Sequence, residues 1–419
     1  MSTAKLITES KLLGARRESK IKYLTCFITI GFVCITFFYY YQGLVLGLSF
    51  PNNTFLPLPI GFGDFFGVVD QWAAFKFKGI GYGLSYFPST YLIANFFSNI
   101  HPRYLSLSIF LIGFAVLFIF YVYINLRSER SLISSIHYTF VCVFMTYPVL
   151  FVINTANFEV FIFLFLCLFV YLYQKEMFVL SCIPLAAAIS MKVIPAVFLI
   201  LFISNKKYKE ISLTLFGIFF LSILPLAIFE GGGGGLDVYW SNLMASQKMY
   251  SDLMIMGTAG NHYGHSLLNS LRILMGDNFT SVESVVTPYF FLTLFIFSLI
   301  AVFIAFVEKI FWKKIALLVI CMCLLPYTST DYKLLHFFIP LFLFINAKDD
   351  GKNNSIQFDI YYIGIFSLLL IPKNYFYFHG QPLYSVNNVL NTALMIILCS
   401  LIIVTTYKSK RSNVGMSKH

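Results

Sequence analysis

Two carboxylates follow the first apolar run of the chain, in the segment Gly61-Phe-Gly-Asp64-Phe-Phe-Gly-Val-Val-Asp70-Gln-Trp. In an aromatic setting beside a membrane, desolvation raises the pKa of a carboxyl group toward the range that a general base needs. Asp64 and Asp70 are six residues apart, so in a helix they leave from different faces and do not form a catalytic pair. Asp64 is the candidate general base and Asp70 the alternative. A helix cap and a solvated charge are the structural roles open to the same residues.

A single cation, Lys192, lies inside an otherwise apolar run from Val179 to Ser204. A charge at bilayer depth costs about 2.5 to 3.5 kcal/mol on insertion scales, so an anionic partner is expected. Pro195 lies three residues later and interrupts any continuous helix, because proline has no amide donor and its ring clashes with the preceding turn. A broken helix that carries a cation indicates a binding site, unless the lysine snorkels to the headgroups.

More polar residues lie where other apolar runs end. Asn157 and Glu159 follow the apolar run 132–153, and Tyr332 and Lys333 precede the run 334–347. His262 and His265 lie between the runs 211–229 and 287–307. The two histidines are three residues apart and share a helix face, but no third metal ligand lies near them in the sequence, so no metal site is predicted. Hydrogen bonding to a phosphate or a sugar is the favoured role for these residues.

The composition indicates which kind of fold must carry these residues. Of the 419 residues, 59% are hydrophobic and 11% are charged, and the mean hydropathy is +0.81. These values lie far from those of soluble domains, and the apolar runs are long enough to cross a bilayer as helices. The predicted fold is an all-α polytopic membrane protein that forms one domain over residues 1–419. Its net charge of +11 comes from short basic clusters between the runs, so no nucleic-acid partner is predicted.

Placing the basic clusters in the cytoplasm orients the spans and puts both chain termini there. The stretch 179–204 then has both ends in the cytoplasm, so the chain must enter the membrane and return, turning near Lys192 and Pro195. With this hairpin we expect ten to twelve transmembrane helices. The other predicted spans are 22–48, 104–126, 132–153, 158–174, 211–229, 287–307, 314–327, 334–347, 358–371 and 388–406.

Two long loops lie outside in this topology, residues 49–103 and 230–286. The first holds both candidate carboxylates and a segment, 82–99, whose aromatic residues suit a helix lying on the outer surface. The second holds the two histidines. Since the other polar residues lie at the outer ends of spans, all of these groups are expected at one level of the bilayer, where a lipid headgroup lies.

The order of short motifs along most of the chain resembles a known superfamily. The motifs are Gly-Asp64-Phe, Tyr86-Phe-Pro88, Tyr147-Pro148, Asn157-Phe-Glu159, Ala186-Ala-Ala-Ile-Ser-Met-Lys192-Val-Ile-Pro195, His265-Ser266-Leu-Leu, and the segment from Pro326 to Pro340. Their set resembles the GT-C superfamily of integral-membrane glycosyltransferases that use a polyprenyl-phosphate sugar. Within it, the likeness is to the family 87 mannosyltransferases and to the phage-type O-antigen glucosyltransferases.

The resemblance implies a division of roles among the candidate residues. Asp64 matches the acidic residue of the first outer loop that activates the acceptor hydroxyl, and the sugar leaves a polyprenyl phosphate with inversion and without a metal. Lys192, His265 and Lys333 become contacts of the donor phosphate. The chain departs from the family at Asp331-Tyr332-Lys333, where family 87 members often have paired histidines after a Ser-Trp. The donor sugar and the subfamily therefore stay open.

The predicted function is that of a hexosyltransferase. It moves a hexose from a polyprenyl-phosphate sugar to a surface-glycan or lipid-linked acceptor, with no cofactor, on the periplasmic or extracellular face of a bacterial inner membrane. The alternatives are a polysaccharide or lipid-linked sugar transporter, a flippase and an O-antigen polymerase. A transporter is expected to show an internal repeat with paired broken helices, and the run around Lys192 has no clear counterpart. A polymerase is expected to carry more arginine in its outer loops.

Overall fold

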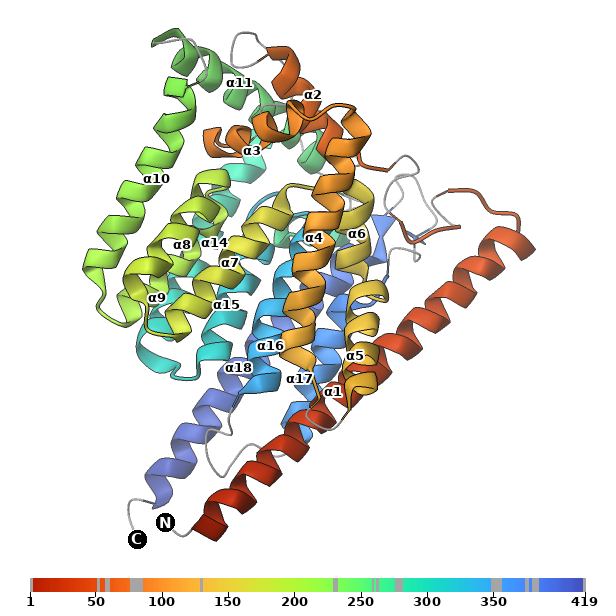
Figure 1. Cartoon of the computed structure of the whole chain (residues 1–419), viewed down its shortest axis with the longest axis vertical. Helices are drawn as coiled ribbons and strands as arrows, with labels where there is room; N and C mark the ends of the chain where they lie inside the picture. The colour runs from red at the N-terminus through yellow and green to blue at the C-terminus, as the bar shows by residue number, and fades with distance from the viewer. Residues whose placement is uncertain are drawn as a thin grey trace.

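The structure of the protein is a computed structural model, and nearly all of the described chain is helical (Figure 1). The structure describes residues 3–50, 53–56, 61–75, 86–128, 131–228, 233–257, 260, 264–275, 282–347, 356–373, 377–378 and 384–416. The helices are α1 (Thr3–Tyr40), η1 (Tyr41–Val45), α2 (Gly63–Phe75), α3 (Pro88–Ser98), α4 (Arg103–Leu126), α5 (Leu132–Phe144), α6 (Tyr147–Thr155), α7 (Glu159–Gln174), α8 (Phe178–Met191), η2 (Ile194–Phe198), α9 (Leu199–Ser204), α10 (Tyr208–Ile228), α11 (Gly233–Ser251), η3 (Asp252–Met256), α13 (Leu267–Met275), α14 (Val282–Val302), η4 (Phe303–Val307), α15 (Phe311–Leu324), η5 (Asp331–Phe337), α16 (Phe338–Asn346), α17 (Ile356–Leu370) and α18 (Val386–Met416). Two short strands, β1 (Tyr377–Phe378) and β2 (Tyr384–Ser385), pair antiparallel before α18.

Five helices of the described chain are long and apolar enough to cross a membrane. They cover Gly14–Val45, Arg103–Leu126, Tyr208–Leu226, Val285–Val307 and Val386–Ser409, and the bent pair of α5 and α6 makes a sixth span if it is counted as one. The predicted class, an all-α polytopic membrane protein, is confirmed. Five or six such helices are fewer than the predicted ten to twelve, and further apolar helices of the described chain are shorter, namely Glu159–Gln174, Phe178–Met191, Ile194–Ser204 and Gln357–Leu370.

Two prolines explain where two of these helices end. A proline ring clashes with the carbonyl group of the residue four positions earlier, so a helix that contains both of these residues is disfavoured. α5 ends at Phe144, four residues before Pro148, and α8 ends at Met191, four residues before Pro195. The first break bends the predicted span 132–153 by 57°. The second leaves Lys192 extended, with φ −149° and ψ 135°.

The chain turns back after α8, as predicted for residues 179–204. The Tyr173 hydroxyl, at the end of α7, donates to the Leu201 carbonyl of α9 at 2.7 Å, and the Asn205 side-chain amide donates to the same hydroxyl at 2.8 Å. The Lys207 ammonium lies 4.4 Å from the ring centre of Phe178, the first residue of α8. Both ends of the stretch therefore lie together, and the turn between α8 and η2 carries Lys192 at the other end of the hairpin.

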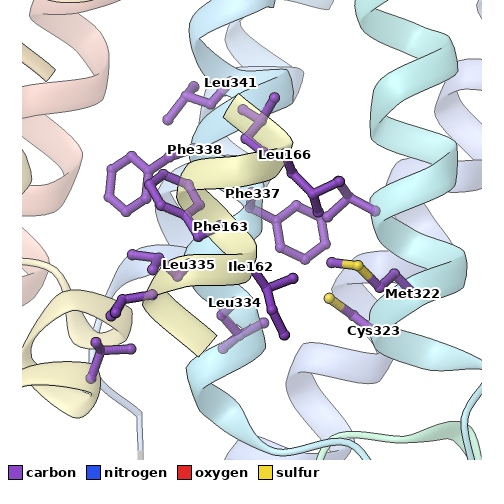
Figure 2. Close-up of a cluster of buried hydrophobic side chains, with 14 of the residues drawn as sticks. Ile162, Phe163, Leu166, Met322, Cys323, Leu334, Leu335, Phe337, Phe338 and Leu341 are labelled. Carbon is purple, nitrogen blue, oxygen red and sulfur yellow. The ribbon is translucent and has the colours of Figure 1, made fainter. Parts of the chain in front are cut away.

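The apolar core lies among α7, α15, η5 and α16 (Figure 2). Ile162, Phe163 and Leu166 of α7 face η5 and α16, where Leu334, Leu335, Phe337, Phe338 and Leu341 lie, and Met322 and Cys323 of α15 close the cluster. α10 and α14 lie at the rim, and only 11% of the apolar stretch of each is buried. This packing fixes the positions of α7 and η5 relative to each other.

Three helices that do not span, α2, α3 and α11, lie at the end of the bundle opposite to both chain termini (Figure 1). α3 covers residues 88–98 of the segment 82–99 that was predicted to form a helix on the outer surface. Its start docks on the end of α8, because the Ser89 hydroxyl donates to the Ser190 carbonyl at 2.5 Å and the Phe87 amide donates to the Met191 carbonyl at 3.4 Å. The start of α3 therefore lies beside the end of α8, next to Lys192.

Candidate active site

Asp64 is the second residue of α2, and two contacts fix that helix. The Phe62 amide, just before α2, donates to the Asn154 carbonyl of α6 at 2.6 Å. Farther along α2, the fully buried Trp72 donates from its indole nitrogen to Asn95 Oδ1 of α3 at 3.0 Å. The candidate base therefore lies on a docked helix, against the corner between α6 and α7.

The Asp64 carboxylate is tied to that corner by an asparagine. Asn157 Nδ2 donates to Asp64 Oδ2 at 2.7 Å, and Asn157 Oδ1 accepts from the Glu159 amide at 2.8 Å. The corner itself is sharp, because Ala156 adopts a left-handed conformation with φ 51° at the end of α6. Burial raises the pKa of Asp64 above its usual 3.8, while the Asn157 hydrogen bond and the charge of Lys192 oppose that rise.

Glu159, the first residue of α7, divides its carboxylate between two partners. Its Oε2 lies 2.5 Å from Lys192 Nζ, and its Oε1 lies 2.9 Å from His336 Nε2 of η5. The Glu159 side chain is 2% exposed, whereas that of Lys192 is 21% exposed. Glu159 is therefore the internal anion that the insertion cost of Lys192 requires, and Lys192 is the member of the pair that a ligand can reach.

Aromatic rings and a second lysine surround Lys192. Its ammonium lies 5.3 Å from the ring centre of Tyr86 and 4.8 Å from that of Tyr332, and 3.4 Å from the Tyr332 hydroxyl. Lys333 is 3% exposed and interacts electrostatically with both Lys192 and Glu159. Lys192 and Lys333 therefore place two positive charges near the carboxylates of Glu159 and Asp64, and the partly exposed ammonium group of Lys192 is the one that suits an external anion such as a phosphate.

A second buried network, centred on Asp331, lies beside the first. Asp331 Oδ2 accepts from the Tyr147 hydroxyl at 2.9 Å and from Asn387 Nδ2 at 2.6 Å, and its Oδ1 lies 2.9 Å from His265 Nδ1. His265 Nε2 lies 3.2 Å from the Ser329 hydroxyl. An ionised carboxylate only accepts hydrogen bonds, so Nδ1 of the imidazole donates and Nε2 accepts. Burial lowers the pKa of His265, which favours the neutral ring.

The structure brings most of the predicted site residues together. Asn157, Glu159, Lys192, Tyr332 and Lys333 lie in or beside one network with Asp64. Their assignment as donor contacts stays a prediction.

The remaining predicted residues lie elsewhere. His265 is fully buried and both of its ring nitrogens face protein groups, so this conformation offers a phosphate no free nitrogen on that ring. Asp70 is half exposed and pairs with Arg103 at 3.3 Å, and no described hydrogen bond joins it to the network. His262 lies outside the described residues. Across the described chain, no three His, Cys, Asp or Glu side chains are grouped as metal ligands.

Four residues of these networks, His336, Tyr147, Asn387 and Ser329, were not identified from the sequence. His336 lies inside the predicted span 334–347, and an ionisable residue at that depth was a signal of the same kind as Lys192. Tyr147 was noted only as part of a Tyr-Pro motif. Asn387 opens α18 in a stretch with two more asparagines, Asn388 and Asn391, and nothing in the sequence indicated which partner it would bind.

One comparison with known proteins gives a match. The family model described as glycosyltransferase family 87 matches residues 85–330. The matched stretch is more than half of the 419 residues and contains Asn157, Glu159 and Lys192, whereas Asp64 precedes it. No curated protein and no solved structure matches the chain.

Proposed function

The chain belongs to glycosyltransferase family 87, and from that premise we propose that it moves a hexose from a polyprenyl-phosphate sugar to an acceptor hydroxyl. The acceptor is a surface glycan or a lipid-linked glycan, and the sugar is transferred with inversion. One observation carries the proposal: a carboxylate, Asp64, and an ammonium group, Lys192, are joined through Asn157 and Glu159 in a single network.

In this reaction Asp64 is the general base. Its carboxylate takes the proton of the acceptor hydroxyl as the oxygen of that hydroxyl forms a bond to the anomeric carbon of the sugar. The bond between that carbon and the phosphate oxygen breaks at the same time, and the polyprenyl phosphate leaves with the electron pair. Attack opposite to the leaving group inverts the anomeric carbon. The raised pKa of Asp64 supports this role, because it makes the carboxylate a stronger base.

The cations stabilise the departing phosphate. Lys192 is the more exposed partner of its ion pair, and Lys333 adds a second positive charge beside it. Fixed charges that face the developing negative charge contribute strongly when they are preorganised, and loss of one such donor costs on the order of 100-fold or more in rate. Glu159 pairs with the Lys192 ammonium group and His336 pairs with Glu159, so these two residues position the cation without contact to the donor.

The proposed location is the outer face of a bacterial inner membrane. The end of the bundle that carries α2, α3 and α11 lies opposite to both chain termini (Figure 1). The basic segment before the first span and the basic end of α18 favour a cytoplasmic position for those termini. With this orientation Asp64 and Lys192 meet a lipid-linked donor at the periplasmic surface.

Sugar transfer by the purified protein tests this proposal. The protein, reconstituted in lipid, is offered radiolabelled polyprenyl-phosphate hexoses one at a time with membrane glycans as acceptors. We expect transfer from one of these donors, and we expect Asp64→Asn to lower the rate by at least about 100-fold, because the general base is lost. Asp70→Asn is the matched control, since Asp70 lies in the same helix but in an exposed ion pair.

Two results would count against the proposal. Transfer at the wild-type rate by Asp64→Asn would remove Asp64 from the reaction. Failure of the folded protein with every donor, combined with movement of a lipid-linked sugar across the bilayer in a flux assay, would favour a transporter or flippase.

A further inference from the structure

We propose that Asn157 is a positioning residue for the general base, and not a contact of the donor. The inference rests on the proposed function, in which Asp64 takes the proton of the acceptor. It differs from the prediction made for Asn157 in the sequence, where this residue was placed with the sugar-binding and phosphate-binding groups.

Both ends of the Asn157 side chain are already used by the protein. The amide nitrogen donates to Asp64 Oδ2 at 2.7 Å, the amide oxygen accepts from the Glu159 amide at 2.8 Å, and the residue is 3% exposed. The backbone N–H of Glu159 requires an acceptor, so the oxygen must face it and the NH₂ group must face Asp64. A donor sugar would have to displace one of these bonds to reach Asn157.

The same corner also fixes the backbone on both sides of this contact. The Asn154 carbonyl, at the end of α6, accepts from the Phe62 amide just before α2. Phe65, the residue after Asp64 in α2, stacks on Phe158 with ring centres 6.1 Å apart, and both rings are fully buried. Asp64 therefore lies between two fixed points, and the Asn157 amide selects the orientation of its carboxylate.

The Asn157 hydrogen bond also stabilises the ionised form of Asp64. The groups that act on this carboxylate are the Asn157 amide, the Thr155 hydroxyl and the charge of Lys192, and all three oppose the rise of its pKa caused by burial. Loss of the amide therefore raises the pKa of Asp64 further, so a larger fraction of the base is protonated at low pH. A residue that only contacts the donor would leave this protonation unchanged.

Two substitutions separate the hydrogen bond to Asp64 from the hydrogen bond with the Glu159 amide. Asn157→Ser keeps an oxygen that accepts from the Glu159 amide but is too short to reach Asp64. Asn157→Asp also keeps an oxygen that accepts from the Glu159 amide, and it places a second carboxylate where the donor to Asp64 had been. Asn99→Ser, at an exposed end of α3, is the matched control for removal of an asparagine.

We expect Asn157→Ser to move the acid limb of the kcat/KM profile to higher pH and to lower kcat/KM about tenfold on that limb, as for loss of a hydrogen bond to a charged group. The KM for the donor should stay close to that of the wild type. Asn157→Asp should lose more activity, because two carboxylates meet. An unchanged acid limb with a higher donor KM would instead show that Asn157 is a donor contact.

An infrared titration makes the test independent of activity. The band of the protonated Asp64 carboxyl group is identified as the one that is absent in Asp64→Asn, and its midpoint is compared between wild type and Asn157→Ser. A midpoint moved to higher pH in Asn157→Ser supports the positioning role even if no tested donor yields transfer. An equal midpoint in the two proteins overturns the role even if the enzyme transfers sugar as proposed.

Discussion

Lys192 Nζ lies 2.5 Å from Glu159 Oε2, and the two side chains differ tenfold in exposure, 21% against 2%. The carboxylate is enclosed by the protein, while the ammonium group opens toward Tyr86 and Tyr332. A buried ion pair is a weak source of net stability, but removal of one member leaves a charge without compensation. The carboxylate of Glu159 therefore stabilises a cation at a partly exposed position that apolar surroundings alone would not stabilise.

Removal of the carboxylate should destabilise the protein. Glu159→Gln leaves the Lys192 ammonium without its counter-ion and weakens the hydrogen bond to His336, so we expect a loss of about 3 kcal/mol in the free energy of unfolding. Thermal unfolding of the purified protein in detergent measures the change. Asp70→Asn, which breaks an exposed pair, should cost at most about 1 kcal/mol.

The double variant Lys192→Met with Glu159→Gln completes this test. It removes both charges at once, so we expect it to regain part of the stability that Glu159→Gln loses, while transfer stays impaired because the phosphate contact is gone. Strictly additive losses in the two single variants would mean that the pair is not coupled.

The rate of transfer should fall in acid. Asp64 accepts a proton only when it is ionised, and its pKa is raised above 3.8 by burial. As the pH drops through this raised pKa, the carboxylate becomes protonated and kcat/KM decreases, with its acid limb above the range of an exposed aspartate. A pH profile of the wild type, with melting temperatures at each pH, measures this limb. A profile that is flat down to pH 3.8 would contradict it.

The Asp331 network should contribute mainly to stability. Asp331→Asn replaces one of the two acceptor oxygens by an NH₂ group, which then faces either the donors from Tyr147 and Asn387 or the donor from His265, so we expect a cost of about 2 kcal/mol. Tyr147→Phe removes one donor of the three and should cost less. Thermal unfolding ranks the variants, and equal stability of Asp331→Asn and wild type would show that the network does not bind the helices together.

Thiol labelling should reveal the return of the chain after α8. In a background in which the exposed Cys26 and Cys34 are replaced by alanine, Glu176→Cys and Lys206→Cys should react with a membrane-impermeant maleimide from the cytoplasmic side only. Asp70→Cys should react only from the opposite side. Opposite labelling of positions 176 and 206 would mean that the stretch crosses the bilayer once.

Local rules of the sequence predicted the elements that hold the site. The charge of Lys192 and the position of Pro195 predicted that the helix breaks there and that the chain turns back. In the structure α8 ends at Met191, the residue whose carbonyl group the ring of Pro195 would meet in a continuous helix. The basic clusters predicted that Glu159, Lys192 and Lys333 would lie at one level. Each of these inferences needs only the few residues around the position and the thickness of a bilayer.

The choice of partners could not be predicted in the same way. Glu159 and His336 are 177 residues apart, and Asn157 and Asp64 are 93 apart. Which of these residues contact each other depends on how several helices pack. From the sequence alone, no cation could be preferred over the others as the counter-ion of Glu159. His265 shows the result of this ambiguity, because it pairs with Asp331 and not with an external phosphate in this conformation.

The position of α10 and α14 at the rim of the bundle has a consequence for how the chain can change. Only 11% of the apolar stretch of each helix is buried, so most of these side chains lie on the outside of the bundle, where a membrane protein meets the hydrocarbon tails of the bilayer. Lipid does not distinguish leucine from phenylalanine or isoleucine by shape, so we expect the outward positions of α10 and α14 to tolerate substitution by other apolar residues. The polar side chains around Lys192 have no such freedom, since each one serves as a partner of another.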